Sequence, residues 1–270
     1  MTSTNESMPQ SRRVETAAVV THGRVDVEEA LNRVRDVADR VGVRLVDEPR
    51  DADLAIALGG DGTMLRTLAR LLGSDTPVIG VNFGRVGFLA SIRPDDLERD
   101  LERVFAGEYR SVELPTIEVR HDGHTHVAVN DVVVTSAVLG RMVEIAYAVG
   151  GEDLGAIPCD GMICATPSGS TAYNLSNGGP VLVRGLEAMA VTFIAPHSLD
   201  ARPLVVPRGV EVTVRNATAG VPAALLVDGH RVADVAPGEE VGIYLAEQRS
   251  LLATLPETTF FGRYRETFSS

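Results

Sequence analysis

The sequence predicts two domains of different fold class, an α/β domain followed by an all-β domain. Up to about residue 107, short apolar runs alternate with segments that carry apolar residues at helical spacing. Beyond that point the apolar segments are short, rich in Val and separated by turn residues, which is typical of antiparallel strands. Alternation of strands and helices favours a mostly parallel, Rossmann-like sheet in the first domain.

The predicted boundaries follow from this change of pattern. We expect a disordered lead-in over 1–13, the α/β domain over 14–111 and the β-rich domain over 112–250. The remaining tail, 251–270, carries apolar side chains and is expected to pack back on the first domain. A cleft between the two domains is the expected ligand site, because small-molecule sites favour domain interfaces.

The individual elements can be assigned from the same patterns. In the first domain the expected strands are 16–20, 43–46, 52–58 and 77–81, and the expected helices are 25–41, 63–72 and 95–105. In the second domain the expected strands include 112–120, 126–136, 141–149 and 162–165. Asp122-Gly123 and Asp228-Gly229 are hairpin signals, because both dipeptides adopt the backbone that two-residue turns require.

Composition excludes several classes of protein. No apolar stretch approaches the roughly 18 residues that a membrane-spanning helix needs, and the first 13 residues lack the apolar segment of a signal peptide. We therefore expect a cytoplasmic protein that does not bind membranes. With 25 basic and 37 acidic residues the net charge is −12. This excess of acid disfavours nucleic acid as a partner, since phosphate backbones would be repelled.

Every basic residue is Arg, and Lys is absent. A Walker A loop, a protein-kinase active site and Schiff-base chemistry all need a Lys amine, so all three are excluded. The only two cysteines, Cys159 and Cys164, are too few for a disulfide framework, and we expect them to be small buried side chains.

The loop Gly59-Gly60-Asp61-Gly62-Thr63 follows an apolar strand and precedes a helix. Its three glycines let backbone N–H groups approach an anion closely, and the helix directs its positive end to the same place. Thr63 is suited to capping that helix. The loop therefore predicts a phosphate cradle, in which the Asp61 carboxylate would accept a proton or help hold Mg²⁺. The alternative is a tight turn in which Asp61 only caps the helix.

The glycine loop resembles one that occurs in NAD kinases, in diacylglycerol and sphingosine kinases and, as a near variant, in phosphofructokinases. A second motif separates these groups. Residues 160–180 read DGMICATPSGSTAYNLSNGGP and resemble the long signature of NAD kinases. The segment 195–207, APHSLDARPLVVP, is similar to the stretch that follows it in that family, and Gly80-Val81-Asn82-Phe83-Gly84, Gly87-Phe88-Leu89 and Asn130-Asp131 also fit. The resemblance spans roughly residues 55–230 in family order.

The resemblance implies roles for individual residues. Asp61 would be the proton acceptor, and Gly59, Gly60, Gly62 and Thr63 would form the phosphate loop. The residues implied to contact the nucleotide are Asp61, Gly62, Arg66, Asn130, Asp131, Arg141, Asp160, Thr171, Ala172, Tyr173, Asn174, Leu175, Ser176, Ala195 and His230. The run 171–176 would wrap the adenine and ribose, with Tyr173 available for stacking. No protein side chain is assigned as a metal ligand.

Three positions depart from the family pattern. Asp131 stands where relatives carry Glu, Pro158 where they often carry Arg or Lys, and His230 where some carry Gln. Asp228-Gly229 before His230 is equally a hairpin turn, so the role of His230 in the site stays open.

The function implied is an NAD kinase, a phosphotransferase with an alcohol group as acceptor. It would move the γ-phosphate of ATP, or a phosphate of polyphosphate, to the 2′-hydroxyl of the adenosine ribose of NAD, with a divalent metal, Mg²⁺, as cofactor. A homodimer or homotetramer is expected by resemblance. Two alternatives remain open: a lipid or sugar kinase that shares the glycine loop, and a non-catalytic NAD-binding sensor.

Overall fold

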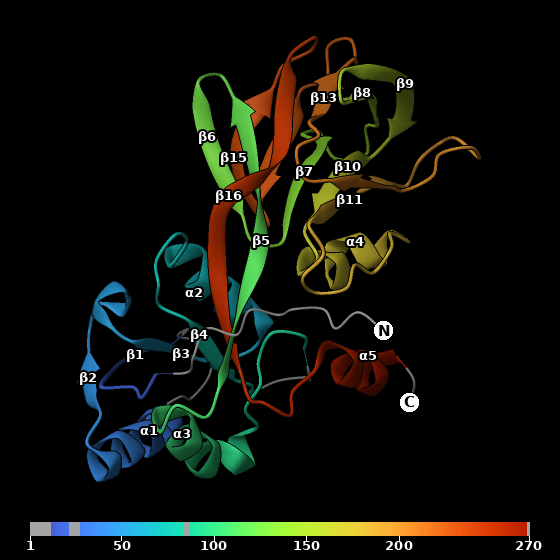
Figure 1. The fold of residues 1–270 in the computed structure, drawn as a ribbon. Helices are drawn as coiled ribbons and strands as arrows, with labels where there is room; N and C mark the ends of the chain where they lie inside the picture. The colour runs from blue at the N-terminus through green and yellow to red at the C-terminus, as the bar shows by residue number, and fades with distance from the viewer. Residues whose placement is uncertain (1–11, 22–27, 84–86, 269–270) are drawn as a thin grey trace. The chain divides into compact units, whose positions relative to one another are not determined.

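The computed structural model describes residues 12–21, 28–83 and 87–268. The chain forms two compact units (Figure 1). The first, called the α/β unit, comprises Met1–Glu113 and Ser250–Ser270, and the second, called the β unit, comprises Leu114–Arg249. The expected disordered lead-in falls almost entirely on residues outside the described ranges.

The α/β unit contains a parallel sheet in the order β2-β1-β3-β4, to which the end of β16 adds. Its strands are β1 (Thr16–Thr21), β2 (Arg44–Val46), β3 (Leu54–Leu58), β4 (Val78–Val81) and β16 (Glu240–Thr254). All five residues of β3 are buried, as expected for a central strand of a sheet covered on both faces. This strand leads directly into the glycine loop.

The described residues of the α/β unit also form four α-helices. They are α1 (Glu28–Val41), α2 (Asp61–Arg70), α3 (Leu97–Phe105) and α5 (Phe260–Phe268), with short 3₁₀ turns η1 (Pro49–Asp51) and η2 (Pro94–Asp96). Of these helices, α1, α2 and α3 have buried residues and α5 has none. In α1 the buried side chains are Ala30, Val34, Val37 and Ala38, at the helical spacing seen in the sequence. Residues 95–96, expected to be α-helical, belong to the 3₁₀ turn η2 instead, because Pro94 begins that turn.

The segment after β16 also belongs to the α/β unit. Ala253 and Leu255 are buried in the same core as β3 and α1. Beyond them α5 is half-exposed and has no buried residue, yet the Arg263 guanidinium donates to the carbonyls of Ala90 (2.9 Å) and Ser91 (3.4 Å).

The β unit consists of strands paired almost entirely antiparallel, together with one short helix, α4 (Tyr173–Ser176). One sheet has the order β12-β11-β10-β7-β14-β15, and a second group pairs β16-β13-β8-β9 and β5-β6. The strands are β5 (Arg110–His121), β6 (His124–Ala128), β7 (Asp131–Ser136), β8 (Val143–Val149), β9 (Glu152–Cys159), β10 (Gly161–Ala165), β11 (Ala188–Ile194), β12 (Leu204–Pro207), β13 (Val212–Asn216), β14 (Ala223–Val227) and β15 (His230–Val235). Both fold classes expected from the sequence, α/β and all-β, are confirmed.

The expected strand 126–136 is wrong, because the chain divides there into β6 and β7. β6 pairs with β5, whereas β7 pairs with β10 and β14 in the other sheet. Between them the side chain of Asp228 accepts hydrogen bonds from the amides of Val129 (2.9 Å), Asn130 (2.7 Å) and Asp131 (3.2 Å). A carboxylate thus takes the place of a strand partner for three successive donors, which lets the chain change sheets.

The two hairpin signals and the two cysteines behave as expected. Asp122-Gly123 and Asp228-Gly229 all have positive φ (46°, 73°, 49° and 79°) and join β5 to β6 and β14 to β15. Cys159 and Cys164 lie on consecutive strands, and both are buried in one core. Burial raises the pKa of Cys159 to about 11 and that of Cys164 to about 12, so both thiols are protonated at neutral pH.

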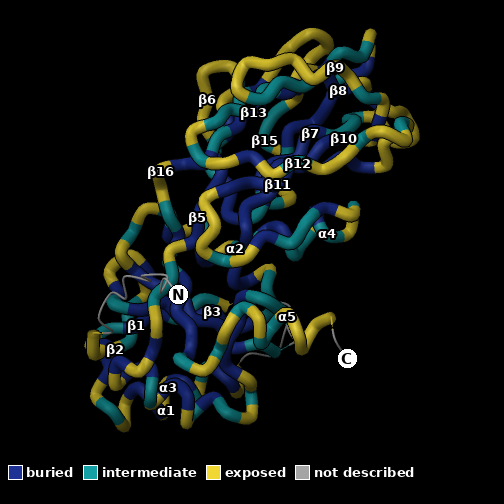
Figure 2. The backbone as a smooth tube through the Cα atoms, turned by 45° about the vertical axis from the view of Figure 1, so that its right-hand side comes forward, coloured by how far each residue is buried: buried dark blue, intermediate teal, exposed yellow. Residues whose placement is uncertain are grey.

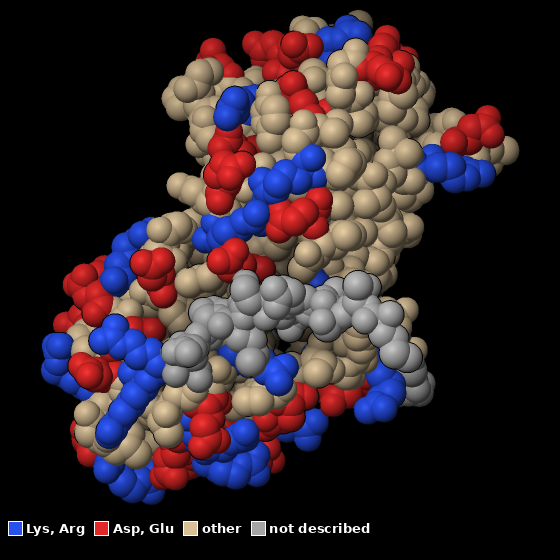
Figure 3. Space-filling model, in the orientation of Figure 1, with Lys and Arg blue, Asp and Glu red and all other residues tan. Residues whose placement is uncertain are grey.

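On the face shown in Figure 3, acidic and basic side chains crowd the α/β unit, and the β unit has a broad uncharged area. Exposed apolar side chains of the β unit include Val138, Leu139, Met142 and Leu154. Figure 2 shows that the core strands are buried while the outer hairpins are exposed.

We expect Asn216→Ala to destabilise the β unit strongly. Asn216 is fully buried; its side-chain amide donates to the carbonyls of Val221 (2.9 Å) and Val235 (3.0 Å), and its oxygen accepts from the Thr218 amide (3.1 Å). Without this side chain, the buried carbonyls of Val221 and Val235 lose their hydrogen-bond donor. We expect the free energy of unfolding to fall by about 2–4 kcal/mol. Urea denaturation measures this. Asn177→Ala, which removes one bond of a half-buried Asn to Tyr173, is the control; equal losses in the two variants would contradict the assignment.

Candidate functional site

Asp61 is the first residue of α2, and Gly60 is the N-cap. No side chain caps this helix. The expectation that Thr63 caps it is therefore wrong, and so is the alternative in which Asp61 is the cap. Thr63 lies within the first turn, where its hydroxyl accepts from Arg66 (3.3 Å). The sequence misplaced the cap because Gly serves as an N-cap without offering a side-chain oxygen.

The Asp61 carboxylate is bound at one oxygen and free at the other. Its Oδ2 accepts a hydrogen bond from the Phe88 amide at 3.0 Å. Its Oδ1 is buried and has no hydrogen-bond partner among the described residues. A buried carboxylate oxygen without a donor is costly, so it marks a position where a ligand's hydroxyl or a metal ion would complete the contacts.

The glycines of the loop divide into two kinds. A Cβ on Gly59 (φ 156°) would lie 2.3 Å from the Thr63 hydroxyl, so the fold itself requires Gly there. A Cβ on Gly60 would meet nothing within 4 Å, and one on Gly62 would meet only the tip of Arg66 at 3.8 Å. The fold of the unit does not need Gly at these two positions. Because neither Gly carries a side chain, a ligand can approach the backbone here closely, beside the positive end of α2.

In the β unit, Asn130 and Asp131 lie at the break between β6 and β7. The Asn130 Oδ1 is buried and, among the described residues, has no hydrogen-bond partner. Asp131 is only 6% exposed. Burial, together with the nearby charge of Asp228, raises the pKa of Asp131 to about 7. Burial also raises the pKa of Asp228, although the three backbone amides and His230 act in the opposite direction.

The loop after β10 is packed against this pair. A Cβ on Gly169 would lie 2.0 Å from the Asn130 carbonyl oxygen, so Gly is required for the two segments to meet. The Thr166 hydroxyl donates to the Val129 carbonyl (2.7 Å) and accepts from the Gly169 amide (3.0 Å). These contacts bring residues 130–131 and 166–171, far apart in sequence, to one place in the unit.

Asn174 and Ser170 hold this loop from within. The Asn174 amide donates to the carbonyls of Ser170 and Pro180, both at 3.0 Å, and its oxygen accepts from Thr192 at 2.7 Å. Ser170 donates to the Pro167 carbonyl at 2.7 Å and accepts from the Leu182 amide. Both side chains are fully buried. The Asn174 side chain thus supports the loop, whereas the resemblance gave it a contact with the nucleotide.

Other residues of the expected site remain accessible. Tyr173, on α4, is 46% exposed and makes no ring contact with a described aromatic residue. Thr171, Ala172 and Leu175 are half-buried, and Ser176 is exposed. This short helix therefore presents an aromatic face and small polar groups to solvent.

Ala195 has an unusual backbone. It follows β11 with φ 43°, which is uncommon for a residue other than Gly. The Asp160 amide donates to the preceding carbonyl, that of Ile194, at 2.9 Å. Asp160 and Ala195 are both exposed and lie at the same end of the β10–β11 pair.

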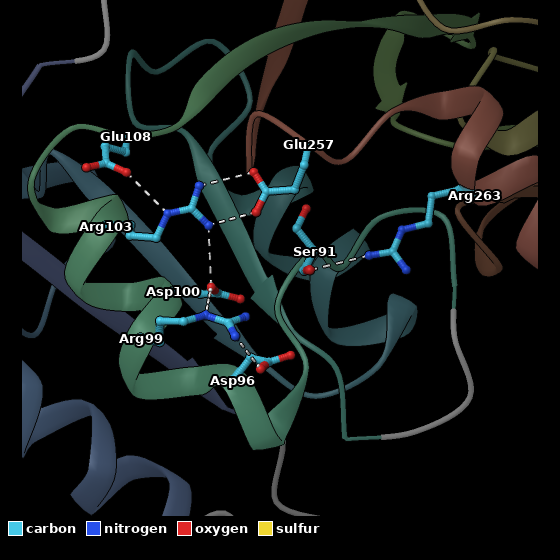
Figure 4. A network of polar contacts seen from close by, with 8 residues as sticks. All are labelled: Ser91, Asp96, Arg99, Asp100, Arg103, Glu108, Glu257 and Arg263. Carbon is cyan, nitrogen blue, oxygen red and sulfur yellow. Dashed lines mark hydrogen bonds and ion pairs between the residues drawn. The ribbon is translucent and has the colours of Figure 1, made fainter.

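Three charged candidates are solvent-exposed: Arg66 on α2, Arg141 in the loop before β8 and His230 at the start of β15. Arg141, expected to begin a strand, lies outside β8 because its amide closes a turn to the Val138 carbonyl at 3.1 Å. Figure 4 shows a separate ionic network of the α/β unit, in which Arg103 contacts Asp100, Glu108 and Glu257.

Comparison with known proteins connects these features to one family. The family model described as ATP-NAD kinase N-terminal domain matches residues 7–109, and the one described as ATP-NAD kinase C-terminal domain matches residues 129–255. The NAD kinase of Heliobacterium modesticaldum is 38% identical over 97% of this chain and 95% of its own length. That of Gemmatimonas aurantiaca is 38% identical over 85% of this chain and 81% of its own.

This chain belongs to the NAD kinase family.

Solved structures agree with this assignment. An NAD kinase from Archaeoglobus fulgidus in complex with ATP has a TM-score of 0.78 at 29% identity, covering 94% of this chain and 97% of that one. Yeast NADH kinase complexed with NADH has the same fold, with a TM-score of 0.81 at 20% identity over 96% of this chain and 88% of its own. The family and the enzyme class expected from the sequence are thus confirmed.

Two features of this NAD kinase were missed by sequence reasoning. Asp228 was taken only as a turn residue, yet it holds the backbone of residues 129–131. The Phe88 amide was not connected with Asp61, 27 residues earlier. An Asp-Gly turn signal does not reveal what the carboxylate contacts, and a backbone amide carries no sequence signal at all.

Asp131 should make the stability of this NAD kinase depend on pH. Its pKa is raised on folding from 3.8 to about 7, so the folded state binds the proton more tightly than the unfolded state. This stabilisation is complete below the unfolded pKa, near 4, and is lost as pH rises toward 7. In Asp131→Asn this loss of stability should disappear. The free energy of unfolding of the variant, relative to that of the parent, should therefore be higher at pH 8 than at pH 4 by about 1 kcal/mol or more.

Urea denaturation from pH 4 to pH 8 measures the difference. Asp160→Asn, an exposed carboxylate in the same unit, is the control and should parallel the parent. An Asp131→Asn variant whose stability follows the parent curve across this range would refute the raised pKa.

Proposed function

We propose that this chain transfers the γ-phosphate of ATP to the 2′-hydroxyl of the adenosine ribose of NAD, giving NADP. The observation that carries the proposal is the buried Oδ1 of Asp61, which no described residue partners, in a loop whose glycines leave the backbone open. Membership of the NAD kinase family supplies the substrate class.

Asp61 is the proton acceptor in this proposal. The 2′-hydroxyl donates to Oδ1 and attacks the γ-phosphorus; the bond from that phosphorus to the β,γ-bridging oxygen breaks, the proton passes to Asp61, and ADP leaves. Oδ2 stays bound to the Phe88 amide throughout, so the carboxylate does not rotate during the transfer. The exposed amides at the start of α2 lie beside the transferred phosphate, where the helix dipole favours negative charge.

The β unit binds the dinucleotide. Asn130 offers a side-chain oxygen that no described residue partners, and Asp131 offers a carboxyl group beside it. The open ring of Tyr173 stacks on a base, and the small residues 171–176 follow the ribose. Arg66, Arg141, Asp160, Ala195 and His230 complete the proposed contact set.

A divalent metal, Mg²⁺, is also part of the proposal, without a side chain assigned as its ligand. Among the described residues no group of three or more His, Cys, Asp or Glu could hold a metal. Mg²⁺ keeps several waters and binds substrate phosphates, so Oδ1 of Asp61 remains available to the 2′-hydroxyl. When bound, the metal would neutralise charge on the donor phosphates.

The donor, the assembly and the location are further parts of the proposal. ATP is the donor we favour over polyphosphate, because the relative from Archaeoglobus fulgidus was solved with ATP. A homodimer or homotetramer is supported by the exposed apolar side chains of the β unit around Leu139 and Leu154. No helix among the described residues is long and apolar enough to cross a membrane. We place the enzyme in the cytoplasm, where both substrates occur.

Replacing Asp61 tests the mechanism. Asp61→Asn keeps the shape of the side chain and an oxygen for the Phe88 amide but cannot take a proton. We expect kcat for NADP formation from NAD, ATP and Mg²⁺ to fall by ~10²–10⁴-fold, the usual contribution of a general base. The dissociation constant for NAD, from calorimetry, should change little.

The control is Asp75→Asn, an exposed carboxylate of the same unit, which should retain the parent rate. Undiminished turnover in Asp61→Asn would remove Asp61 from the reaction. Phosphorylation of a sugar or lipid in place of NAD would favour the kinase alternative, and NAD binding without any product in the parent would favour the sensor.

Gly62→Ala tests the open backbone. Among the described residues only the tip of Arg66, at 3.8 Å, lies within 4 Å of the added methyl group, and Ala is the better helix former by up to about 1 kcal/mol. We therefore expect unchanged or higher thermal stability together with a fall in kcat/KM of at least about 10-fold, since a misplaced substrate loses rate steeply. Differential scanning fluorimetry and the NADP assay measure the two effects. Parent activity in a stable variant would show that no ligand passes close to this residue.

A further inference from the structure

We propose that the C-terminal helix α5 positions Asp61 for proton transfer, acting through the backbone of residues 87–91. The inference rests on the proposed role of Asp61 as proton acceptor. It assigns a part in the reaction to a helix that contributes no buried residue to the core. Every residue in the argument belongs to the α/β unit.

The Asp61 side chain needs an external restraint. The terminal torsion of an Asp side chain is soft, so rotation exchanges its two oxygens at little cost. Among the described residues, the Phe88 amide donates to Oδ2 of this carboxylate and no group donates to Oδ1. The bond from the Phe88 amide to Oδ2 therefore determines that Oδ1 is the oxygen without a donor among the described residues.

Gly87 limits the carboxylate on the same side. A Cβ at this position would lie 2.1 Å from Oδ2 and 2.3 Å from both Oδ1 and Cγ of Asp61. The backbone of residues 87–88 is thus in direct contact with the carboxylate, and any displacement of this backbone moves the hydrogen-bond donor. The position of the segment decides the position of the base.

Aromatic contacts from α5 hold the segment at Phe88. The Phe88 ring lies 6.0 Å from the ring of Phe260 and 5.7 Å from that of Phe268, between centroids, at angles of 42° and 33°. Tyr264 contacts Phe268 at 4.9 Å from the next turn of the helix. Such pairs contribute about 0.5–1.5 kcal/mol each beyond the area they bury.

Arg263 holds the same segment at its other end. Its guanidinium donates to the carbonyls of Ala90 (2.9 Å) and Ser91 (3.4 Å), and Figure 4 shows the side chain reaching from α5 toward Ser91. The side chain is 11% exposed, and Glu266 lies 3.3 Å from it. Charged donors form the stronger hydrogen bonds, so this contact restrains the carbonyls against movement. Residues of α5 thus contact both the Phe88 ring and the backbone of Ala90 and Ser91.

Other residues of α5 point away from this segment and provide matched controls. Phe261 is 67% exposed and contacts only the Phe260 ring among described aromatic residues. Arg265 is exposed, in contrast to Arg263. Equal substitutions at neighbouring positions therefore separate loss of the contact with residues 87–91 from a general effect on the helix.

The test compares Phe260→Ala with Phe261→Ala in the NADP assay. We expect Phe260→Ala to lower kcat by about 10–100-fold, the loss typical of a misplacement approaching 1 Å, with KM for NAD changed less than about threefold. Phe261→Ala should keep the parent kcat, and Phe260→Tyr, which retains the ring, should restore most of the rate. Equal rates in Phe260→Ala and Phe261→Ala would overturn the proposal.

A double-mutant cycle identifies the route of the effect. If α5 acts through the Asp61 carboxylate, Phe260→Ala should not lower the residual rate of Asp61→Asn any further. A further loss of the same size in that background would overturn the proposal, because the helix would then act on something other than the base. Normal turnover of Asp61→Asn alone would instead reject the proposed function, so the two failures are distinguishable.

A second pair of variants keeps the test decisive if Phe260→Ala does not fold. Arg263→Gln removes the charged donors from the Ala90 and Ser91 carbonyls, and Arg265→Gln is its control on the same helix. We expect a fall in kcat of about 10-fold for the first and none for the second, with the same independence from Asp61→Asn. Equal rates for these two variants would contradict the proposal.

Discussion

A single hydrogen bond, from a backbone amide to one oxygen of Asp61, determines what the other oxygen can do. A carboxylate with both oxygens satisfied within the protein would be a structural group, and one with neither satisfied would rotate freely. Here Oδ2 is bound by Phe88, and Oδ1 is buried with no donor in the part of the chain that the structure describes. The fully buried strand β3, the Gly60 cap and the segment that follows β4 all contribute to that asymmetry.

Carboxylates serve different purposes elsewhere in the molecule, and their surroundings explain which. Asp228 accepts three backbone amides and so becomes part of the framework where the chain passes from one sheet to the other. Asp131, held beside it and nearly excluded from water, has a pKa near neutrality because burial and its neighbour's charge both oppose ionisation. A glutamate at this position would place its carboxylate one methylene farther from the backbone.

Much of the fold and the family could be read from the sequence, because both depend on local patterns. Apolar periodicity located the strands and helices of the α/β unit, and Asp-Gly pairs located two hairpins. The sequence pattern did not predict the break between β6 and β7 at residues 129–130. A continuous run of strand-forming residues does not reveal that the distant Asp228 takes the place of a strand partner. The start of α2 at Asp61 was also not predicted, because in the sequence an N-cap Gly cannot be distinguished from any other loop Gly. The candidate site residues on α2 and in 160–180 were named by resemblance. Only the structure could show that the Asn174 side chain is hydrogen-bonded within the protein.

The order of the chain has a consequence for how the enzyme is made. The β unit interrupts the α/β unit in sequence, and residues that complete the α/β core, Ala253 and Leu255, are translated only after the whole β unit. A ribosome that has synthesised the first 113 residues has therefore made the glycine loop 59–63 before the end of β16 and before α5, which belong to the same unit. Because domains fold as units during synthesis, the β unit is free to fold first and the glycine loop is assembled last. In the proposed mechanism, Asp61 is thus synthesised well before α5, the helix that would position it.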